Sequence, residues 1–149
     1  MDVESNQIVL AFDPGGTTGV ALWAEGRLIW TTELIFEASF NDFFFVLGEA
    51  LTALQEAKIK SPLRSDIEIV IEEVSARSRT FDERAIEAMG IIKYIFRAHP
   101  ITMHPPAKMK GPRTWPNVDL KGHPSQHVRD AVSHILAYTK TTTFSFPTE

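Results

Sequence analysis

The sequence predicts a single α/β domain in which a mixed five-stranded sheet is flanked by helices. Apolar runs rich in Ile, Val and Leu alternate with longer segments whose apolar residues recur at helical spacing. Their order is three strands, a helix, a strand, a helix, a strand and a last helix, which favours helices on both faces of a mixed sheet. The 149 residues suit one domain with a sizeable core. We expect residues 1–140 to form that domain and residues 141–149 to form a flexible tail.

The strands are predicted from apolar runs that end at turn residues. They are expected at residues 8–13, in the run after Gly19, and at residues 27–34, 67–74 and 101–103. The first two form a hairpin, and Glu25-Gly26 is the turn before the third strand.

Three helices are predicted from capping residues and apolar spacing. The first runs from its N-cap Asn41 to about residue 58, with Phe44, Leu47, Leu51 and Leu54 as its apolar face. The second begins at Thr80, with Glu83 completing a capping box, and stops at residue 99 before Pro100. The third runs from Pro124 to about residue 139. Residues 104–123, rich in Pro and Gly, are expected to form a long functional or disordered loop.

Composition excludes several classes of function. The chain has no cysteine, which rules out disulfides, thiolate catalysis and cysteine-bound zinc. No apolar run is long enough to span a membrane, and the N-terminus is polar and acidic. We therefore expect a cytoplasmic protein with no membrane partner.

The net charge of −4 argues against non-specific coating of nucleic acid, but basic residues gather in two segments. Candidates for phosphate contact are Arg77 and Arg79, which lie near Arg84, and Lys108, Lys110, Arg113 and Lys121. The alternative is that both segments are solvated loops.

Asp13 stands at the end of a strand expected to be buried, directly before Pro14, Gly15 and Gly16. A buried carboxylate is costly unless a cation or hydrogen bonds compensate it, and glycines let another molecule's backbone approach closely. The segment indicates either a metal or phosphate site or an ordinary hairpin in which Asp13 caps the turn.

Glu72 ends another apolar strand, so Asp13 and Glu72 would meet if the two strands are neighbours. The last helix adds His127, Asp130 and His134, which share one face because they are spaced i, i+3 and i+7. Sparse carboxylates are sufficient for Mg²⁺, which keeps several of its waters. Without metal, the crowded carboxylates should raise at least one pKa.

Other interpretations of these residues stay open. Glu73 could be the functional acid in place of Glu72. His127 and His134 alone are better explained as an exposed helix face, and a zinc site from them is weakly supported because no HExxH spacing is present.

The segments AFDPGGTTGVAL, IVIEEV and HVRDAVSHILAY, in this order, resemble the RuvC family of Holliday junction resolvases, which have an RNase H-like fold. The resemblance implies that Asp13, Glu72, His127 and Asp130 are the catalytic and metal-binding residues. It also implies two Mg²⁺ ions for each active site, with Mn²⁺ able to substitute, and four-way DNA junctions as substrate. The nicks would carry 5′-phosphate and 3′-hydroxyl ends.

A homodimer is also implied, because symmetric resolution needs two active sites. The helix over residues 80–99 carries apolar side chains that could form its interface or pack in the core. These are Ile86, Met89, Ile92, Ile95 and Phe96.

The chain departs from the bacterial pattern at Ser75, where the family often has an aromatic residue, and in the short, Pro-rich segment 104–127. In these departures the chain resembles the phage-encoded members of the family. The resemblance implies activity on a wider range of branched DNA, in the host cytoplasm.

Three other functions are compatible with parts of the pattern. Another RNase H-like nuclease, such as a YqgF-like RNA-processing enzyme or a phage packaging nuclease, would share the carboxylates. A non-catalytic DNA-binding module would need only the basic segments. The actin-like sugar kinases have a similar loop, Asp-x-Gly-Thr-Thr, but they need two domains to enclose ATP, so we expect no nucleotide cofactor.

Overall fold

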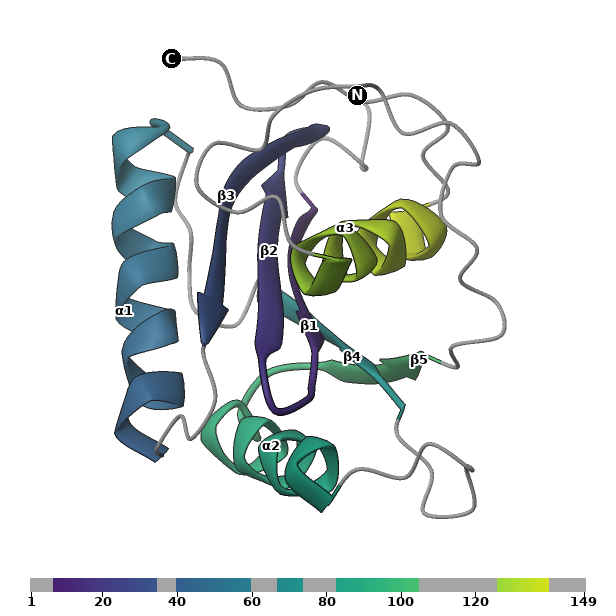
Figure 1. Ribbon diagram of the computed structural model, residues 1–149. Coiled ribbons are helices and arrows are strands. Elements are labelled where there is room, and N and C mark those ends of the chain that lie inside the picture. The colour runs from purple at the N-terminus through teal and green to yellow at the C-terminus, as the bar shows by residue number, and fades with distance from the viewer. Residues whose placement is uncertain (1–6, 35–39, 60–66, 74–82, 105–125, 140–149) are drawn as a thin grey trace.

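A computed structural model describes residues 7–34, 40–59, 67–73, 83–104 and 126–139. These residues form five strands and three helices in the predicted order (Figure 1). The elements are β1 (Ile8–Asp13), β2 (Thr18–Ala24), β3 (Arg27–Leu34), α1 (Phe40–Glu56), β4 (Ile67–Glu72), α2 (Glu83–Ile95), β5 (Ile101–His104) and α3 (Gln126–Thr139). The predicted fold class is confirmed.

The strands form one mixed sheet in the order β3-β2-β1-β4-β5. The hairpins β1–β2 and β2–β3 are antiparallel, whereas β1–β4 and β4–β5 are parallel. The turn between β2 and β3 is the predicted Glu25-Gly26 pair, with φ angles of 52° and 74°. Such left-handed pairs match the twist of a tight hairpin. Central strand β1 is apolar on both faces as far as Asp13 because helices cover both.

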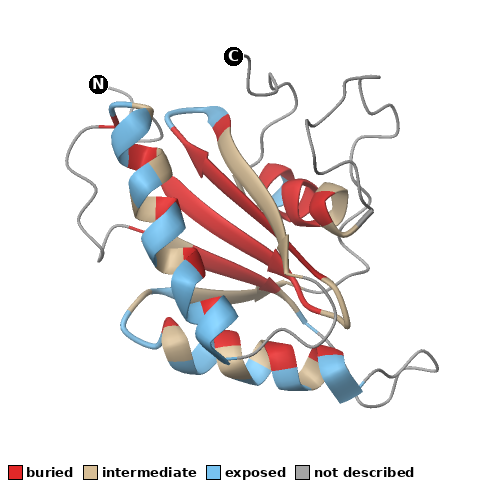
Figure 2. Cartoon of the chain, turned by 60° about the vertical axis from the view of Figure 1, so that its left-hand side comes forward, coloured by how far each residue is buried: buried red, intermediate tan, exposed pale blue. Residues whose placement is uncertain are grey.

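Helices α1 and α2 lie on one face of the sheet and α3 on the other (Figures 1 and 2). Alternation along β1 sends Leu10 and Phe12 into the core under α1 and α2. Ala11 packs in the core under α3 instead. The same alternation places Asp13 on the α3 side of the sheet.

The predicted apolar face of α1 is correct in part: Leu47, Leu51 and Leu54 pack against the core, whereas Phe44 does not. The helix begins at Phe40 and buries Phe43, Val46, Ala50 and Leu54, of which only Leu54 belongs to the predicted stripe. Phe44 and Phe45 are exposed. Because residues 43–45 are all phenylalanine, more than one apolar helix face has the correct helical spacing. Packing against the sheet determines which of these faces is buried.

Helix α2 ends at Ile95, four residues before the predicted end. Phe96 N–H still donates to Ile92, but the chain then tightens, with His99 N–H donating to the carbonyl of Phe96 at 2.8 Å. Pro100 disfavours helical geometry at His99, the residue before it, so the helix cannot reach the predicted end unchanged. Ile92 and Phe96 are fully buried, so the core-packing alternative explains both.

Helix α3 is fastened to the sheet at both ends. A Cβ at Gly19 of β2 would lie 2.1 Å from the carbonyl oxygen of His127, so only glycine allows this close approach. At the other end the Tyr138 hydroxyl donates to the Glu68 carboxylate at 2.6 Å. The predicted end at Thr139 is confirmed.

Several sequence predictions lie outside the described residues: Thr80 and Pro124 as helix starts, most of the 104–123 loop, and the tail. Within the described part of the chain, no helix is both long and apolar enough to cross a membrane.

Candidate active site

Asp13 and Glu72 lie side by side at one edge of the sheet. Parallel strands β1 and β4 pair Phe12 with Ile71, so the next residue of each strand reaches the same edge. Asp13 is buried, and its carboxyl interacts with that of Glu72. Glu73 is exposed, and its backbone N–H donates to the carbonyl of His104. The strand-end prediction therefore selects Glu72 and not Glu73.

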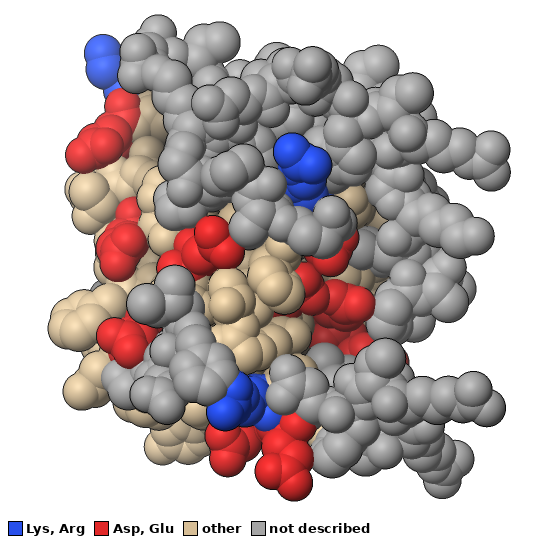
Figure 3. Space-filling view, viewed as in Figure 1, with Lys and Arg blue, Asp and Glu red and all other residues tan. Residues whose placement is uncertain are grey.

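The first turns of α3 bring the other two predicted residues to this edge. His127 Nδ1 lies 3.4 Å from Asp13 Oδ2, a consequence of the contact between α3 and Gly19. Asp130 interacts with the same Asp13 carboxyl. Thus β1, β4 and α3 gather Asp13, Glu72, His127 and Asp130 around one point, as the sequence predicts. Acidic side chains gather below α3 on the face shown in Figure 3.

The two strand-end carboxyls are strongly unequal acids. Burial, helped by the carboxyls of Glu72 and Asp130, raises the pKa of Asp13 to about 10. Burial also opposes ionisation of Glu72, but its close contacts with His134 and Asp13 outweigh burial and lower the pKa of Glu72 to about 2. Asp13 therefore keeps a proton that it shares with Glu72. The prediction that crowding raises at least one pKa is confirmed, with burial as the larger cause.

The chemistry of these donors fits a divalent cation, which would replace the shared proton and neutralise the remaining carboxylates. Among the described residues, no three acidic or histidine side chains are arranged to hold a metal ion as they stand. Binding would therefore need some of these side chains to rotate.

His134 contradicts the prediction of an exposed histidine face. Its side chain is fully buried, with Nδ1 2.8 Å from His104 Nδ1 and Nε2 3.5 Å from Glu72 Oε2. His104 was not among the predicted site residues. One sequence signal could have identified His104: it directly follows the predicted strand 101–103. If that strand lies parallel to the strand ending in Glu72, the two residues reach the same edge of the sheet.

A hollow of about 180 Å³ lies beside the turn that follows Asp13. Gly15 and Gly16 of the turn line it, with Arg84 and Glu87 of α2 on the other side. The six basic residues predicted to contact DNA lie outside the described residues. They are Arg77, Arg79, Lys108, Lys110, Arg113 and Lys121.

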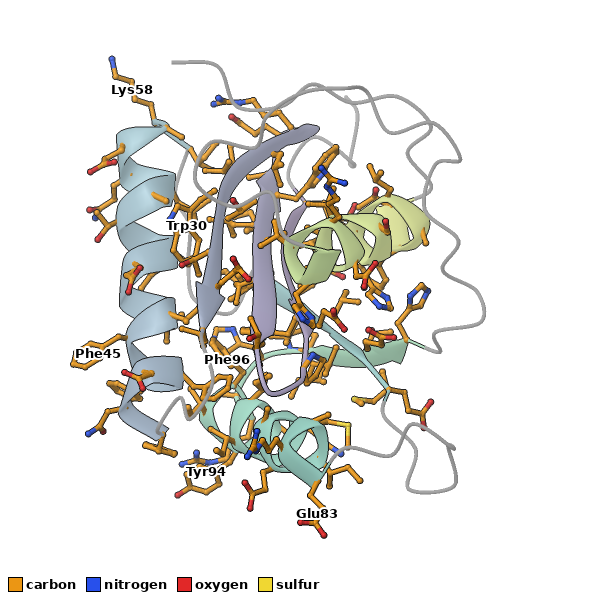
Figure 4. All side chains as sticks on the ribbon, in the orientation of Figure 1. Trp30, Phe45, Lys58, Glu83, Tyr94 and Phe96 are labelled. Atoms are coloured by element: carbon orange, nitrogen blue, oxygen red, sulfur yellow. The ribbon has the colours of Figure 1, made fainter. Side chains whose placement is uncertain are left out.

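Exposed aromatic side chains gather where α1 approaches α2. The large hydrophobic residues that are exposed in the described part of the chain are Phe40, Phe44, Phe45 and Tyr94. Phe40 stacks on Phe44 and also contacts Tyr94, with ring centroids 6.4 and 6.1 Å apart. Phe45 points away from α1 into solvent (Figure 4). We call Phe40, Phe44 and Tyr94, whose rings contact one another, the aromatic patch.

Comparison with solved structures identifies the fold. RuvC from T. thermophilus in complex with a Holliday junction substrate superposes with a TM-score of 0.56 at 15% identity, covering 89% of this chain and 92% of that one. A second Thermus thermophilus RuvC structure gives 0.54 at 16% identity, covering 88% and 92%. The chain has a RuvC-like fold. Neither protein-family models nor curated protein sequences give a match.

Proposed function

We propose that this protein is a metal-dependent endonuclease that cuts four-way DNA junctions and other branched DNA. The observation that carries the proposal is the meeting of Asp13, Glu72, Asp130 and His127 at one edge of a RuvC-like sheet. A fold alone does not imply a function, so the argument rests on this cluster. If Asp13 only capped the hairpin turn, it would not need Glu72 of β4 and two residues of α3 beside it.

The four residues would hold two Mg²⁺ ions, for which Mn²⁺ can substitute. Bound ions of this kind activate the attacking water and stabilise the leaving oxygen in phosphodiester hydrolysis. Asp13, which interacts with both other carboxyls, would contact both ions. Glu72, Asp130 and His127 would be the remaining protein ligands of the two ions. The products would carry 5′-phosphate and 3′-hydroxyl ends.

The scissile backbone can approach from the side of the Pro14–Gly16 turn. Gly15 and Gly16 carry no side chain that would obstruct it, and Arg84 lies on the far side of the hollow that these glycines line. The six predicted basic residues would bind flanking phosphates, which position DNA without reading its sequence. The departures at Ser75 and in residues 104–127 favour a phage-type member with broad selectivity.

Symmetric resolution of a junction needs two active sites, so we propose a two-fold homodimer. The aromatic patch on α1 and α2 supports this, because contiguous exposed apolar side chains mark interaction surfaces. Light scattering should show a dimer for wild type and a monomer for the double variant Phe44→Ser, Tyr94→Ser. A wild type that stays monomeric at micromolar concentration would contradict the proposal.

The cleavage experiment uses four-way junctions, linear duplex and structured RNA, each with Mg²⁺ or EDTA. Wild type should nick the junction symmetrically with Mg²⁺ only. Glu72→Gln should slow cleavage at least about 100-fold, because loss of even an indirect partner of a metal ligand costs roughly 10- to 100-fold. Its matched control, Glu73→Gln, changes an exposed neighbour and should cut normally. Cleavage of RNA alone would favour a YqgF-like enzyme, and binding without cleavage a DNA-binding module.

A further inference from the structure

His134 is a fully buried polar side chain that the proposed hydrolysis does not use. It lies on α3, one turn beyond Asp130, and none of its ring is exposed. Its Nε2 has no hydrogen-bond partner within the described residues, and its ion-pair contact is the 3.5 Å approach to Glu72. Buried polar atoms are nearly always satisfied, so an exception that faces a proposed catalytic carboxylate calls for an explanation.

His104 supplies the other half of the arrangement. In the β4–β5 register His104 is the direct neighbour of Glu72, so its side chain projects to the same side of the sheet. The Nδ1 atoms of His104 and His134 are 2.8 Å apart. At that distance one nitrogen must donate a hydrogen and the other must accept it.

The surroundings of His134 determine which ring donates. If neutral His134 donated from Nδ1, its Nε2 would turn a lone pair toward the Glu72 carboxylate, and the two would repel. A doubly protonated His134 would place a positive charge in a fully buried position, where the 3.5 Å contact with Glu72 would have to offset its loss of hydration. If His104 donates from Nδ1, neutral His134 carries its hydrogen on Nε2, the nitrogen that lies 3.5 Å from Glu72 Oε2. This last arrangement makes both contacts attractive without a buried cation.

We propose that His134 is a positioning residue for Glu72, and that His104 fixes the tautomer in which His134 presents Nε2–H to the carboxylate. The inference deepens the proposed nuclease function and rests on it. The partners of a metal-binding carboxylate orient it and tune its affinity for the ion. Here the residue that fixes the tautomer, His104, comes from a third strand, β5, which contributes no residue to the predicted catalytic set.

The first test is made on the metal-free wild-type chain by ¹H–¹⁵N correlation spectroscopy of the histidine rings. His134 should carry its hydrogen on Nε2 and His104 on Nδ1. A hydrogen on Nδ1 of His134, or on both of its nitrogens, would overturn the inference. This measurement needs no variant and no activity.

The second test measures Mn²⁺ binding to the full chain by calorimetry. His134→Leu should weaken binding about 10- to 100-fold. His134→Gln should recover most of it, because the glutamine amide can place an N–H near the position of Nε2. Wild-type affinity in His134→Leu, or equal loss in both variants, would refute the positioning role. A wild type that binds no Mn²⁺ would instead refute the proposed function itself.

Discussion

The raised pKa of Asp13 makes the metal-free protein less stable as the pH rises. The unfolded chain releases this proton near pH 3.8, whereas the folded protein holds it up to about pH 10. A group whose pKa is raised by folding contributes stability that is complete below its unfolded pKa and is lost as pH rises through its folded pKa. The substitution Asp13→Asn keeps the shape of the side chain and removes the titration.

The slope follows from the binding of one proton, which is worth about 1.4 kcal/mol for each pH unit. Between pH 5 and pH 8 the loss amounts to roughly 4 kcal/mol, a large part of the roughly 5–15 kcal/mol typical of a domain. Glu72 does not cancel this loss. Its pKa is lowered from 4.5 to about 2, so the stability that it contributes is already complete above pH 4.5 and is lost only at lower pH.

The assay is urea unfolding in EDTA at several pH values between 5 and 8. Wild type should lose stability by up to about 1.4 kcal/mol for each pH unit relative to Asp13→Asn. At pH 8 the variant should be the more stable of the two. The exposed control Glu73→Gln should follow wild type. Parallel stability curves for wild type and Asp13→Asn would refute the reasoning.

Two further substitutions test how α3 is placed. Gly19→Ala would set a Cβ 2.1 Å from the His127 carbonyl oxygen and should cost about 1–3 kcal/mol in thermal unfolding, with loss of cleavage. The control is Gly48→Ala in the middle of α1, where an added Cβ has no neighbour within 4 Å. This substitution should stabilise the protein by up to about 1 kcal/mol. Equal effects of the two substitutions would contradict the close approach of α3 to Gly19. Tyr138→Phe removes the 2.6 Å hydrogen bond to Glu68 and should cost about 1–2 kcal/mol in urea unfolding, whereas no loss would show that this bond does not fasten α3.

The strand ends of the site could be predicted from sequence. An apolar run ending in Asp13 and another ending in Glu72 place both carboxyls at one edge whenever the strands are parallel neighbours, as they are here. Helical spacing likewise placed His127 and Asp130 on one face of the last helix. Both arguments depend only on regular geometry and not on packing detail.

The parts that were missed depend on tertiary packing. Phe43, Phe44 and Phe45 fit the helical period almost equally, so the buried face of α1 is decided by the sheet beneath it. Burial of His134 follows from its contact with His104 across thirty residues of sequence. No local pattern encodes that pairing, because it arises from the register of β5 beside β4.

The central claim is that the carboxylates of β1, β4 and α3 form one cation site. Its most direct test is the thermal unfolding midpoint of wild type and Asp13→Asn, each measured in EDTA and in millimolar Mg²⁺. An ion that binds only the folded state raises the midpoint by mass action. The account predicts that Mg²⁺ raises the midpoint of wild type and leaves that of Asp13→Asn unchanged. An equal rise in both proteins would contradict it.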